Sequence, residues 1–287
     1  PPPAPAEIDE SGKQIVFVAP NGCGSTQVLL SRSCAQLAPD LVAFEIGLAP
    51  GDLWQLRLDV VPYPDGRVAA PPLVEVRFGT ELEHVRESLT AWRLRVPRVR
   101  SGWRNIEETI SRSVADLASL RMRSEGTVGR LPAAGMPWFM TVFGRDTILT
   151  CLQTFLFGPE LARSALEALA ALQAREDDPS IDAEPGKIVH ELRRGRAAET
   201  WFPAYYGTVD ATPLYLVLLS ETWRWTADVE LARELREPAL RALAWIDEWG
   251  DRDGDGFVEY ERRAPRGLLN QSWKDSGDSQ RFADGRQ

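Results

Sequence analysis

Histidine and cysteine are scarce in this chain. Its 287 residues include two histidines, His84 and His190, and three cysteines, Cys23, Cys34 and Cys151. Two histidines exclude a centre built on several histidine ligands and leave few candidates for a Ser-His-Asp triad. Three cysteines at these spacings fit neither a disulfide framework nor a zinc site. The sequence therefore predicts reduced structural thiols, as in a cytoplasmic protein.

Long apolar runs and an excess of positive charge are also missing. No run approaches the roughly 20 apolar residues of a membrane helix, and the N-terminus lacks the basic-then-apolar pattern of a signal peptide. A formal net charge of -9 disfavours nucleic-acid binding, which needs clustered Lys and Arg. We therefore expect a cytoplasmic protein with no nucleic-acid or membrane partner, acting on a neutral substrate. Residues 1–13 are expected to be a disordered leader.

The first part of the chain has the pattern of β-structure. Residues 53–60 alternate, with Trp54, Leu56, Leu58 and Val60 on one face. Shorter apolar runs bounded by Gly, Pro and Asn lie at 15–18, 27–30 and 42–46. Several strands with polar connections predict part of an antiparallel sandwich over residues 14–79.

The pattern then becomes helical. Residues 80–103 are charged and helix-tolerant, which is typical of a linker. From Trp103 onward, apolar residues recur at intervals of three and four, and further helices are expected at about 146–157, 160–174, 212–226 and 237–249. The long loops at 131–146, 176–210 and 250–287 are functional candidates, because compact domains rarely keep loops of that length. Strands followed only by helices indicate two domains or an α+β arrangement.

Aromatic and charged residues gather in the first of these loops. The motif GMPWFMTVFGRD places Trp138 and Phe139 before the pair Arg145-Asp146 at a helix start. Asp at a helix start is a reasonable cap. The same residues would also make a sugar-binding edge, on which a ring stacks and the charged pair forks onto vicinal hydroxyls. The spacing leaves both interpretations open.

Three later segments carry the remaining candidates. His190 lies in PGKIVHELR, where a lone histidine is more often structural than catalytic. Asp210 lies in YYGTVDATP and is well placed to cap the helix expected near Thr212. The fourth segment, NQSWKDSGDS, holds Asp275 and Asp278 beside an indole and two amides. Solvated loop carboxylates are common, whereas this set of neighbours is less so.

Together, GMPWFMTVFGRDTI, PGKIVHELR, YYGTVDATPLY and NQSWKDSGDS resemble, in this order, the bacterial glycogen-debranching, amylo-α-1,6-glucosidase-like family. The resemblance covers roughly residues 104–287, and residues 14–100 look like the rear part of that family's N-terminal β-sandwich. It implies a mainly α fold with an N-terminal β part: a partial β-sandwich at 14–79, a linker at 80–103 and, over 104–287, the first part of an incomplete (α/α)6 toroid.

The resemblance also implies a reaction, the inverting hydrolysis of an α-glucosidic bond. The α-1,6 bonds of glycogen-type glucans or glucosyl oligosaccharides are the expected substrates, and no cofactor is required. Such an enzyme uses two carboxylates about 6.5–9.5 Å apart, one to protonate the leaving oxygen and one to activate water. The acid is assigned to Asp275, with Asp278 as its rival. The implied substrate-binding residues are Trp138, Phe139, Arg145, Asp146, His190, Glu191, Asp210, Trp273 and Lys274.

The chain departs from the family pattern in two ways. The general base is expected on a later loop, beyond residue 287, and only about five core helices are visible against twelve in a full toroid. We therefore expect a chain truncated at both ends that hydrolyses nothing alone and self-associates through uncovered apolar helix faces. The alternatives are a non-catalytic carbohydrate-binding fragment, half of an enzyme completed by another polypeptide, and an (α/α)6 phosphorylase.

An acidic segment at residues 251–262 resembles the start of an EF-hand loop. Asp251, Asp253 and Asp255 take positions one, three and five, and Gly and an apolar residue follow at six and eight. Position twelve is Arg262 in place of the bidentate glutamate, for which Glu259 or Glu261 would have to substitute. The segment is either a calcium site, the one cofactor that the sequence suggests, or an acidic turn between helices.

Overall fold

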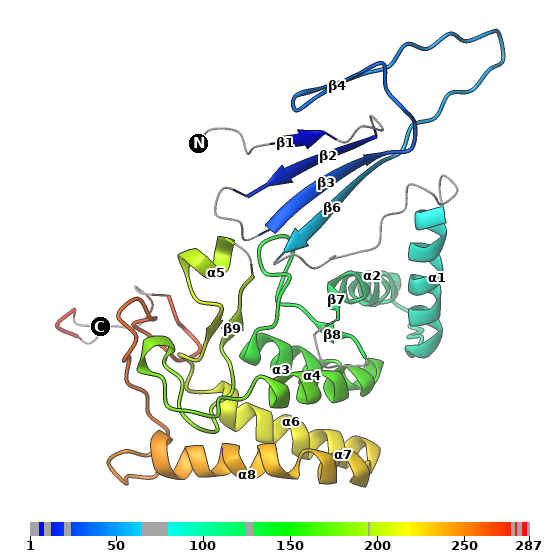
Figure 1. Ribbon diagram of the computed structural model, residues 1–287. Coiled ribbons are helices and arrows are strands. Elements are labelled where there is room, and N and C mark those ends of the chain that lie inside the picture. The colour runs from blue at the N-terminus through cyan, green and yellow to red at the C-terminus, as the bar shows by residue number, and fades with distance from the viewer. Residues whose placement is uncertain are drawn as a thin grey trace. The chain divides into compact units, whose positions relative to one another are not determined.

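The computed structural model describes residues 6–8, 13–19, 24–64, 80–123, 129–194, 196–276, 279 and 283–285 (Figure 1). About 41% of the chain is helix and 16% strand, with an antiparallel sheet first and helices after it. The chain divides into two compact units, residues 1–88 with 194–196 and residues 89–193 with 197–287. The expected order of β part and α part is therefore confirmed, while the described residues show no closed toroid.

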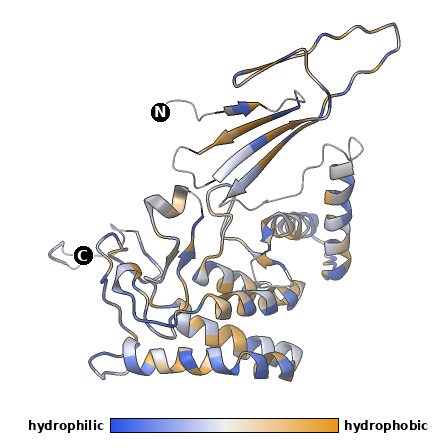
Figure 2. Ribbon diagram, in the orientation of Figure 1, coloured by the Kyte–Doolittle hydropathy of each residue, from blue (hydrophilic) through white to orange (hydrophobic). Residues whose placement is uncertain are grey.

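An antiparallel sheet forms the core of the first unit. Its strand order is β1-β2-β3-β6, and a hairpin of β4 and β5 lies outside it. The strands of this unit are β1 (Ala6–Ile8), β2 (Gln14–Val18), β3 (Gly24–Leu30), β4 (Gln36–Ala38), β5 (Leu41–Ala43) and β6 (Leu58–Pro64). Ile15 and Leu30 are buried on one face of the sheet, and by the strand register the buried Val61 lies on the other face. Figure 2 shows β2 coloured mostly as hydrophobic, while the other strands of the sheet mix hydrophobic and hydrophilic residues.

Two boundaries in the first unit differ from the sequence-based expectations. The last strand begins at Leu58, not at residue 53, because the backbone of residues 55–57 bonds to the turn after β3: Arg32 donates to the Gln55 carbonyl at 2.6 Å and Ser31 N to the Arg57 carbonyl at 3.1 Å. Within the expected leader, Ala6–Ile8 forms strand β1, because the edge of β2 offers it a full antiparallel register. Most of residues 1–13 otherwise lie outside the described ranges.

The expected linker at 80–103 is largely helix. Helix α1 (Thr80–Arg95) runs through most of it, and its Trp92 is 1% exposed. The Trp92 indole donates to the Val114 carbonyl at 3.0 Å, and the Arg121 guanidinium lies 4.2 Å from the indole centroid. A buried tryptophan with a satisfied N–H anchors the second half of this helix to the second unit, and the boundary between the two units falls within the helix.

Helices dominate the second unit. They are α2 (Arg104–Leu120), α3 (Gly144–Gln153), α4 (Glu160–Ala171), α5 (Arg196–Thr200, which begins in the first unit), α6 (Ala211–Thr226), α7 (Val229–Glu234) and α8 (Arg236–Trp245), with 3-10 turns at Phe155–Phe157 and Pro179–Ile181 and a π turn at Ile246–Gly250. Short antiparallel pairs join β7 (Arg121–Met122) to β8 (Leu131–Pro132) and β9 (Glu191–Leu192) to β10 (Ala204–Tyr205). The helices predicted at 146–157, 160–174, 212–226 and 237–249 are confirmed within a few residues.

One apolar core holds these helices together. Ile148 of α3, Leu166 of α4 and Leu218 of α6 are fully buried in it. Several large apolar side chains on α6 and α8 are exposed by contrast. They are Val217, Trp223 and Trp225 of α6 and Leu240 and Leu243 of α8. Self-association through these faces stays a prediction. Every described helix is too short or too polar to span a bilayer.

Candidate functional site

The start of helix α3 fits closely against the segment before β9. Gly144 N donates to the His190 carbonyl at 2.9 Å. A side chain at Gly144 would put its Cβ 2.2 Å from the Val189 carbonyl oxygen, so only glycine allows this approach. The contact places Arg145, the next residue, over the interior of the second unit, where it is 6% exposed.

The Arg145 guanidinium joins three of the four sequence motifs. Its Nε donates to Asp210 Oδ2 at 2.7 Å, and its Nη1 donates to Asp275 Oδ2 and the Trp273 carbonyl, both at 3.2 Å. Its Nη2 donates to the Ser272 carbonyl at 2.9 Å and lies 3.4 Å from Thr208 Oγ1. Burial alone would lower the pKa of Arg145, but the hydrogen bonds and charges of Asp210 and Asp275 raise it. Arg145 is therefore a fixed cation that orients the 272–275 segment.

Asp210 and Asp275, the two aspartates that bind Arg145, differ in what their oxygens contact. Asp210 precedes helix α6 without capping it, because one oxygen binds Arg145 and the other accepts from Thr208 Oγ1 at 2.8 Å. Asp275 contacts Arg145 through Oδ2, while its Oδ1 bonds to no described residue and its side chain is 34% exposed. The expected capping role of Asp210 is thus wrong, since a buried cation competes for its carboxylate. Of these two aspartates, Asp275 is the one with an oxygen that bonds to no described residue.

Asp146 follows Arg145 in the first turn of α3 and also does not cap the helix, whose N-cap position is Phe143. Its side chain keeps an exposed edge. The surrounding protein nevertheless removes enough water from the carboxylate to raise its pKa, and the charges of Asp275 and Asp210 add to that shift. Asp146 therefore takes up a proton more readily than a free aspartate does, and it can still reach a ligand.

His190 is buried beside Asp275. It is 5% exposed and lies edge-on between the rings of Phe143 and Tyr205, 5.8 Å from each. Its Nε2 lies 3.9 Å from Asp275 Oδ2, and its Nδ1 has no partner among the described residues. Burial lowers the pKa of His190 to about 4, and the charge of Arg145 acts in the same direction. The imidazole is therefore neutral at pH 7.

The predicted sugar-stacking residues are exposed. Trp138 is 79% exposed and Trp273 75%, and Phe139 and Lys274 are exposed as well. Residues 135–139, the Trp138 turn, are closed by two hydrogen bonds. Gly135 N donates to the Phe139 carbonyl at 3.1 Å, and Phe139 N donates to the Gly135 carbonyl at 2.9 Å. The solvent-exposed indoles of Trp138 and Trp273 are suited to stacking on a sugar ring.

Glu191 is buried and paired, so it does not simply line a pocket. Its Oε2 accepts from Arg193 Nε at 2.8 Å and lies 2.7 Å from Arg193 Nη2. Burial raises the pKa of Glu191, and the charge of Arg193 opposes that shift. The structure thus brings Arg145, His190, Asp210 and Asp275 into direct proximity and connects Glu191 through Arg193 to the Trp138 turn. Asp278 lies outside the described residues.

A buried polar cluster behind the site escaped the sequence analysis. Asp182 is 1% exposed, and its carboxylate accepts four hydrogen bonds, from Arg263 N at 2.6 Å, Ala264 N at 2.8 Å, Tyr205 Oη at 2.8 Å and Gln271 Nε2 at 3.0 Å. Through Gln271 this aspartate anchors the segment that carries Asp275. Its partners are 23 to 89 residues away in sequence, so no local pattern reveals them.

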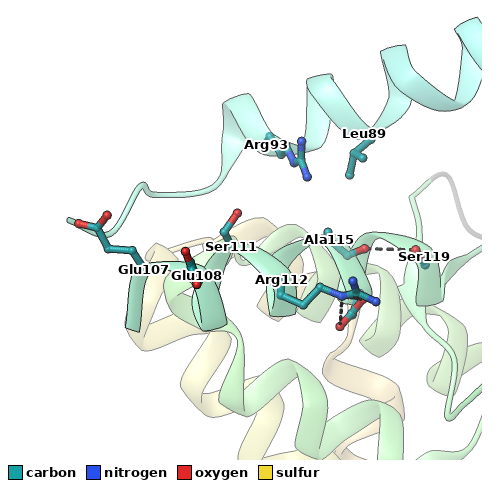
Figure 3. A pocket seen from close by; sticks show the side chains of 9 residues that line it. Leu89, Arg93, Glu107, Glu108, Ser111, Arg112, Ala115 and Ser119 are labelled. Carbon is teal, nitrogen blue, oxygen red and sulfur yellow. Dashed lines mark hydrogen bonds and ion pairs between the residues drawn. The ribbon is translucent and has the colours of Figure 1, made fainter. Parts of the chain in front are cut away.

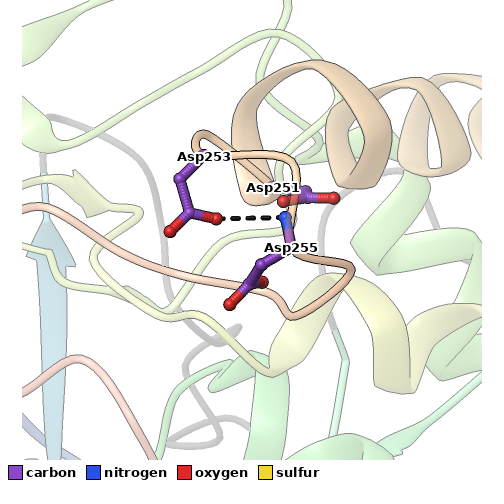
Figure 4. A group of neighbouring side chains, drawn as sticks. All are labelled: Asp251, Asp253 and Asp255. Atoms are coloured by element: carbon purple, nitrogen blue, oxygen red, sulfur yellow. Dashed lines mark hydrogen bonds between the residues drawn. The ribbon is translucent and has the colours of Figure 1, made fainter.

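The predicted calcium ligands converge in part (Figure 4). Carboxylate oxygens of Asp251, Asp253 and Asp255 all lie within 4.8 Å of one another, and Gly254 and Gly256 adopt positive φ of 78° and 87°, which allows the tight loop. Glu259 instead accepts from Arg252 N at 3.3 Å. Each of the three aspartates likewise accepts a hydrogen bond from a backbone N–H of the loop, at 2.8 to 3.1 Å, so all four predicted ligands are engaged by the loop backbone.

A separate groove lies between α1 and α2 (Figure 3). Its volume is about 570 Å³, and its lining includes Leu89, Arg93, Glu107 and Ser111. Arg112 and Asp116, which also line it, pair with each other at 2.9 Å. None of its lining residues belongs to the four motifs, so it is not the candidate site.

No model of a known protein family matches the chain, and no curated protein matches it. The interpretation of the site therefore depends on its geometry and on the resemblance of the four motifs.

Proposed function

We propose that the chain carries a sugar-binding and acid-catalytic site of an α-glucosidase-type glycoside hydrolase. The α-1,6 bonds of glycogen-type glucans or glucosyl oligosaccharides are the preferred candidates for cleavage. The observation that carries this proposal is the Arg145 constellation, in which one buried guanidinium holds Asp210 and Asp275 together. Four motifs that are far apart in sequence supply this constellation and the exposed aromatic residues that accompany it.

In the proposed mechanism, Asp275 is the general acid. A protonated carboxyl at this position donates its proton to the glycosidic oxygen as the bond to the anomeric carbon breaks. Its Oδ1, which bonds to no described residue, is the oxygen available for that transfer. Arg145 orients Asp275 through Oδ2, and Asp146 and the indoles bind hydroxyls and ring faces of the sugar. Asp278 stays the rival for the acid.

Inversion also requires a carboxylate that activates water on the opposite face of the sugar. We assign that base to none of the described residues. Asp210 is engaged by Arg145 and Thr208, and Glu191 by Arg193, while Asp146 is the carboxylate proposed to bind a sugar hydroxyl. The same observation favours a second candidate, a carbohydrate-binding module that retains the sugar contacts and hydrolyses nothing.

Glucose release from glycogen limit dextrin and from isomaltose tests the proposal. The assay is run on the 287-residue chain, for which we expect no release because no described residue is assigned as the base, and on any longer natural polypeptide that contains it. Calorimetry with isomaltose and maltose measures binding separately. Asp275→Asn should abolish release and retain binding, while Asp116→Asn, a change to an exposed ion-paired carboxylate on α2, should alter neither.

Binding without release by either protein would favour the binding-module alternative. If neither protein binds any of these sugars, the proposal is wrong. Glucose 1-phosphate formed only when inorganic phosphate is present would identify the phosphorylase alternative.

A further inference from the structure

Two side-chain contacts attach the Trp138 turn (residues 135–139) to the rest of the site. One is the edge-on packing of Phe139 on Phe143, with ring centroids 5.8 Å apart, and the other is made by Arg193. Arg193 Nη1 donates to the Trp138 carbonyl at 3.1 Å. Among the described residues, Met136, Pro137 and Trp138 make no other hydrogen bond. The turn's own closure, between Gly135 and Phe139, gives it a shape but does not fix its direction.

The same guanidinium is held in place from two further sides. Its Nε and Nη2 bind Glu191 Oε2 at 2.8 and 2.7 Å, and its central carbon lies 5.3 Å from the ring centroids of both Phe139 and Phe143. Glu191 is 5% exposed, and its backbone pairs with Phe143. Arg193 thus joins a rigid, buried carboxylate to an exposed aromatic turn, using the planar fork and the flat face that lysine lacks.

We infer that Arg193 is a positioning residue that holds the Trp138 turn in the orientation in which its indole stacks on a sugar ring. The inference rests on the proposed function for the identity of the ligand. Arg193 itself is 20% exposed at its side chain, with its donors directed to Glu191 and Trp138, so it acts through the turn and not by contacting sugar. Its loss should weaken binding of chains long enough to reach Trp138.

Two measurements on the purified protein test this role. The first is amide hydrogen exchange over residues 135–143, which Arg193→Met should accelerate. The second is calorimetric binding of maltotriose. Arg193→Met should weaken it about fivefold, the factor that corresponds to one lost hydrogen bond, and Arg193→Lys should give an intermediate value. Arg112→Met, which breaks an exposed ion pair on α2, is the matched control and should change neither readout.

A double-mutant cycle separates positioning from a general loss of structure. If Arg193 acts through the indole, Arg193→Met should change maltotriose binding less than about twofold once Trp138→Ala is present. Equal losses in both backgrounds would overturn the inference. Because Arg193→Met leaves the buried Glu191 without its cation, the pair Arg193→Met with Glu191→Gln repeats the test in a protein with no orphaned charge.

The two readouts fail independently. Unchanged exchange over residues 135–143 in Arg193→Met overturns the positioning role whether or not sugar binds. If Arg193→Met accelerates exchange but the wild-type protein binds no sugar, Arg193 still holds the turn. In that case the proposed function is wrong and the positioning role is right.

Discussion

Arg145 and Asp210 form a hydrogen-bonded ion pair of 2.7 Å across 65 residues of sequence. Arg145 lies in the first turn of α3 and Asp210 directly before α6, so the pair fixes the starts of two core helices against each other. Because the same guanidinium also binds the segment from Ser272 to Asp275, the position of the proposed acid depends on the packing of the helices.

Arg145→Lys should therefore disturb both stability and binding. A lysine ammonium is compact and cannot bond acceptors on both sides of the planar guanidinium. Lysine keeps the charge beside Asp210, so what is lost is the set of hydrogen bonds that the two terminal guanidinium nitrogens donate to the 272–275 segment. At about 1 kcal/mol for each of two lost bonds, we expect a loss of about 2 kcal/mol in the free energy of unfolding. Urea denaturation measures it. Arg112→Lys, at an arginine whose side chain is 81% exposed, should stay within about 0.5 kcal/mol of wild type. Equal effects of the two changes would contradict the structural role of Arg145.

His190 should make the protein less stable in mild acid. Its pKa is lowered from 6.5 to about 4, chiefly by burial, so between these values the unfolded chain binds a proton that the folded protein excludes. This stabilising contribution is complete above pH 6.5 and is lost as the pH falls towards 4. From pH 6.5 to pH 5 the loss should reach about 2 kcal/mol.

The matched variant for this effect is His190→Gln, which keeps a polar side chain and does not titrate. The free energy of unfolding is measured for both proteins at pH 7 and pH 5, and the change with pH is compared, since carboxylates contribute equally to both. A wild-type protein that loses no more stability than the variant would show that His190 is not held neutral by burial.

The sequence predicts those parts of the fold and site that depend on interactions between residues close together in the chain. Helices α2, α4 and α6 follow from apolar periodicity, which is a local signal. Helix α1 does not, because its position depends on a hydrogen bond from Trp92 to Val114, 22 residues away. The four motifs identified the residues around Arg145 only through their resemblance to a family, since no spacing rule brings residues 145, 210 and 275 together. The pairing of Asp210 with Arg145 could not be read from the sequence for the same reason, since the two residues are 65 positions apart.

The buried pair of Lys187 and Glu184 should respond unequally to mutation. Lys187 is 2% exposed, and its Nζ lies 3.2 Å from Glu184 Oε2. Burial lowers the pKa of Lys187, and the charge of Glu184 opposes that shift. After Lys187→Met, Glu184 keeps Arg252 at 3.1 Å and the Trp245 indole at 2.7 Å, so the cost should be about 1–2 kcal/mol.

Glu184→Gln should cost more, about 3 kcal/mol, because it leaves Lys187 with a carbonyl contact to Asp182 and no carboxylate, and it also deprives Arg252 of a buried partner. Chemical denaturation of both variants gives the comparison. A larger loss for Lys187→Met than for Glu184→Gln would mean that Arg252 and Arg263, which lie 3.1 and 3.5 Å from Glu184 Oε1, do not support Glu184 in solution.

The acidic loop at 251–262 should bind calcium no more tightly than about the millimolar range of weak sites. Three aspartates converge, but position twelve is Arg262, and the Glu259 carboxylate accepts a backbone hydrogen bond from Arg252. Each missing carboxylate lowers the charge that compensates the dehydration of the ion, and the bidentate glutamate is the ligand that closes such loops.

Arg262→Glu restores a carboxylate at that position and should therefore tighten binding. Calorimetry on metal-free protein compares wild type, Arg262→Glu and Asp253→Asn, which should remove any heat that remains. A micromolar dissociation constant for the wild type would contradict the prediction and would show that Glu259 or Glu261 leaves Arg252 to complete the site.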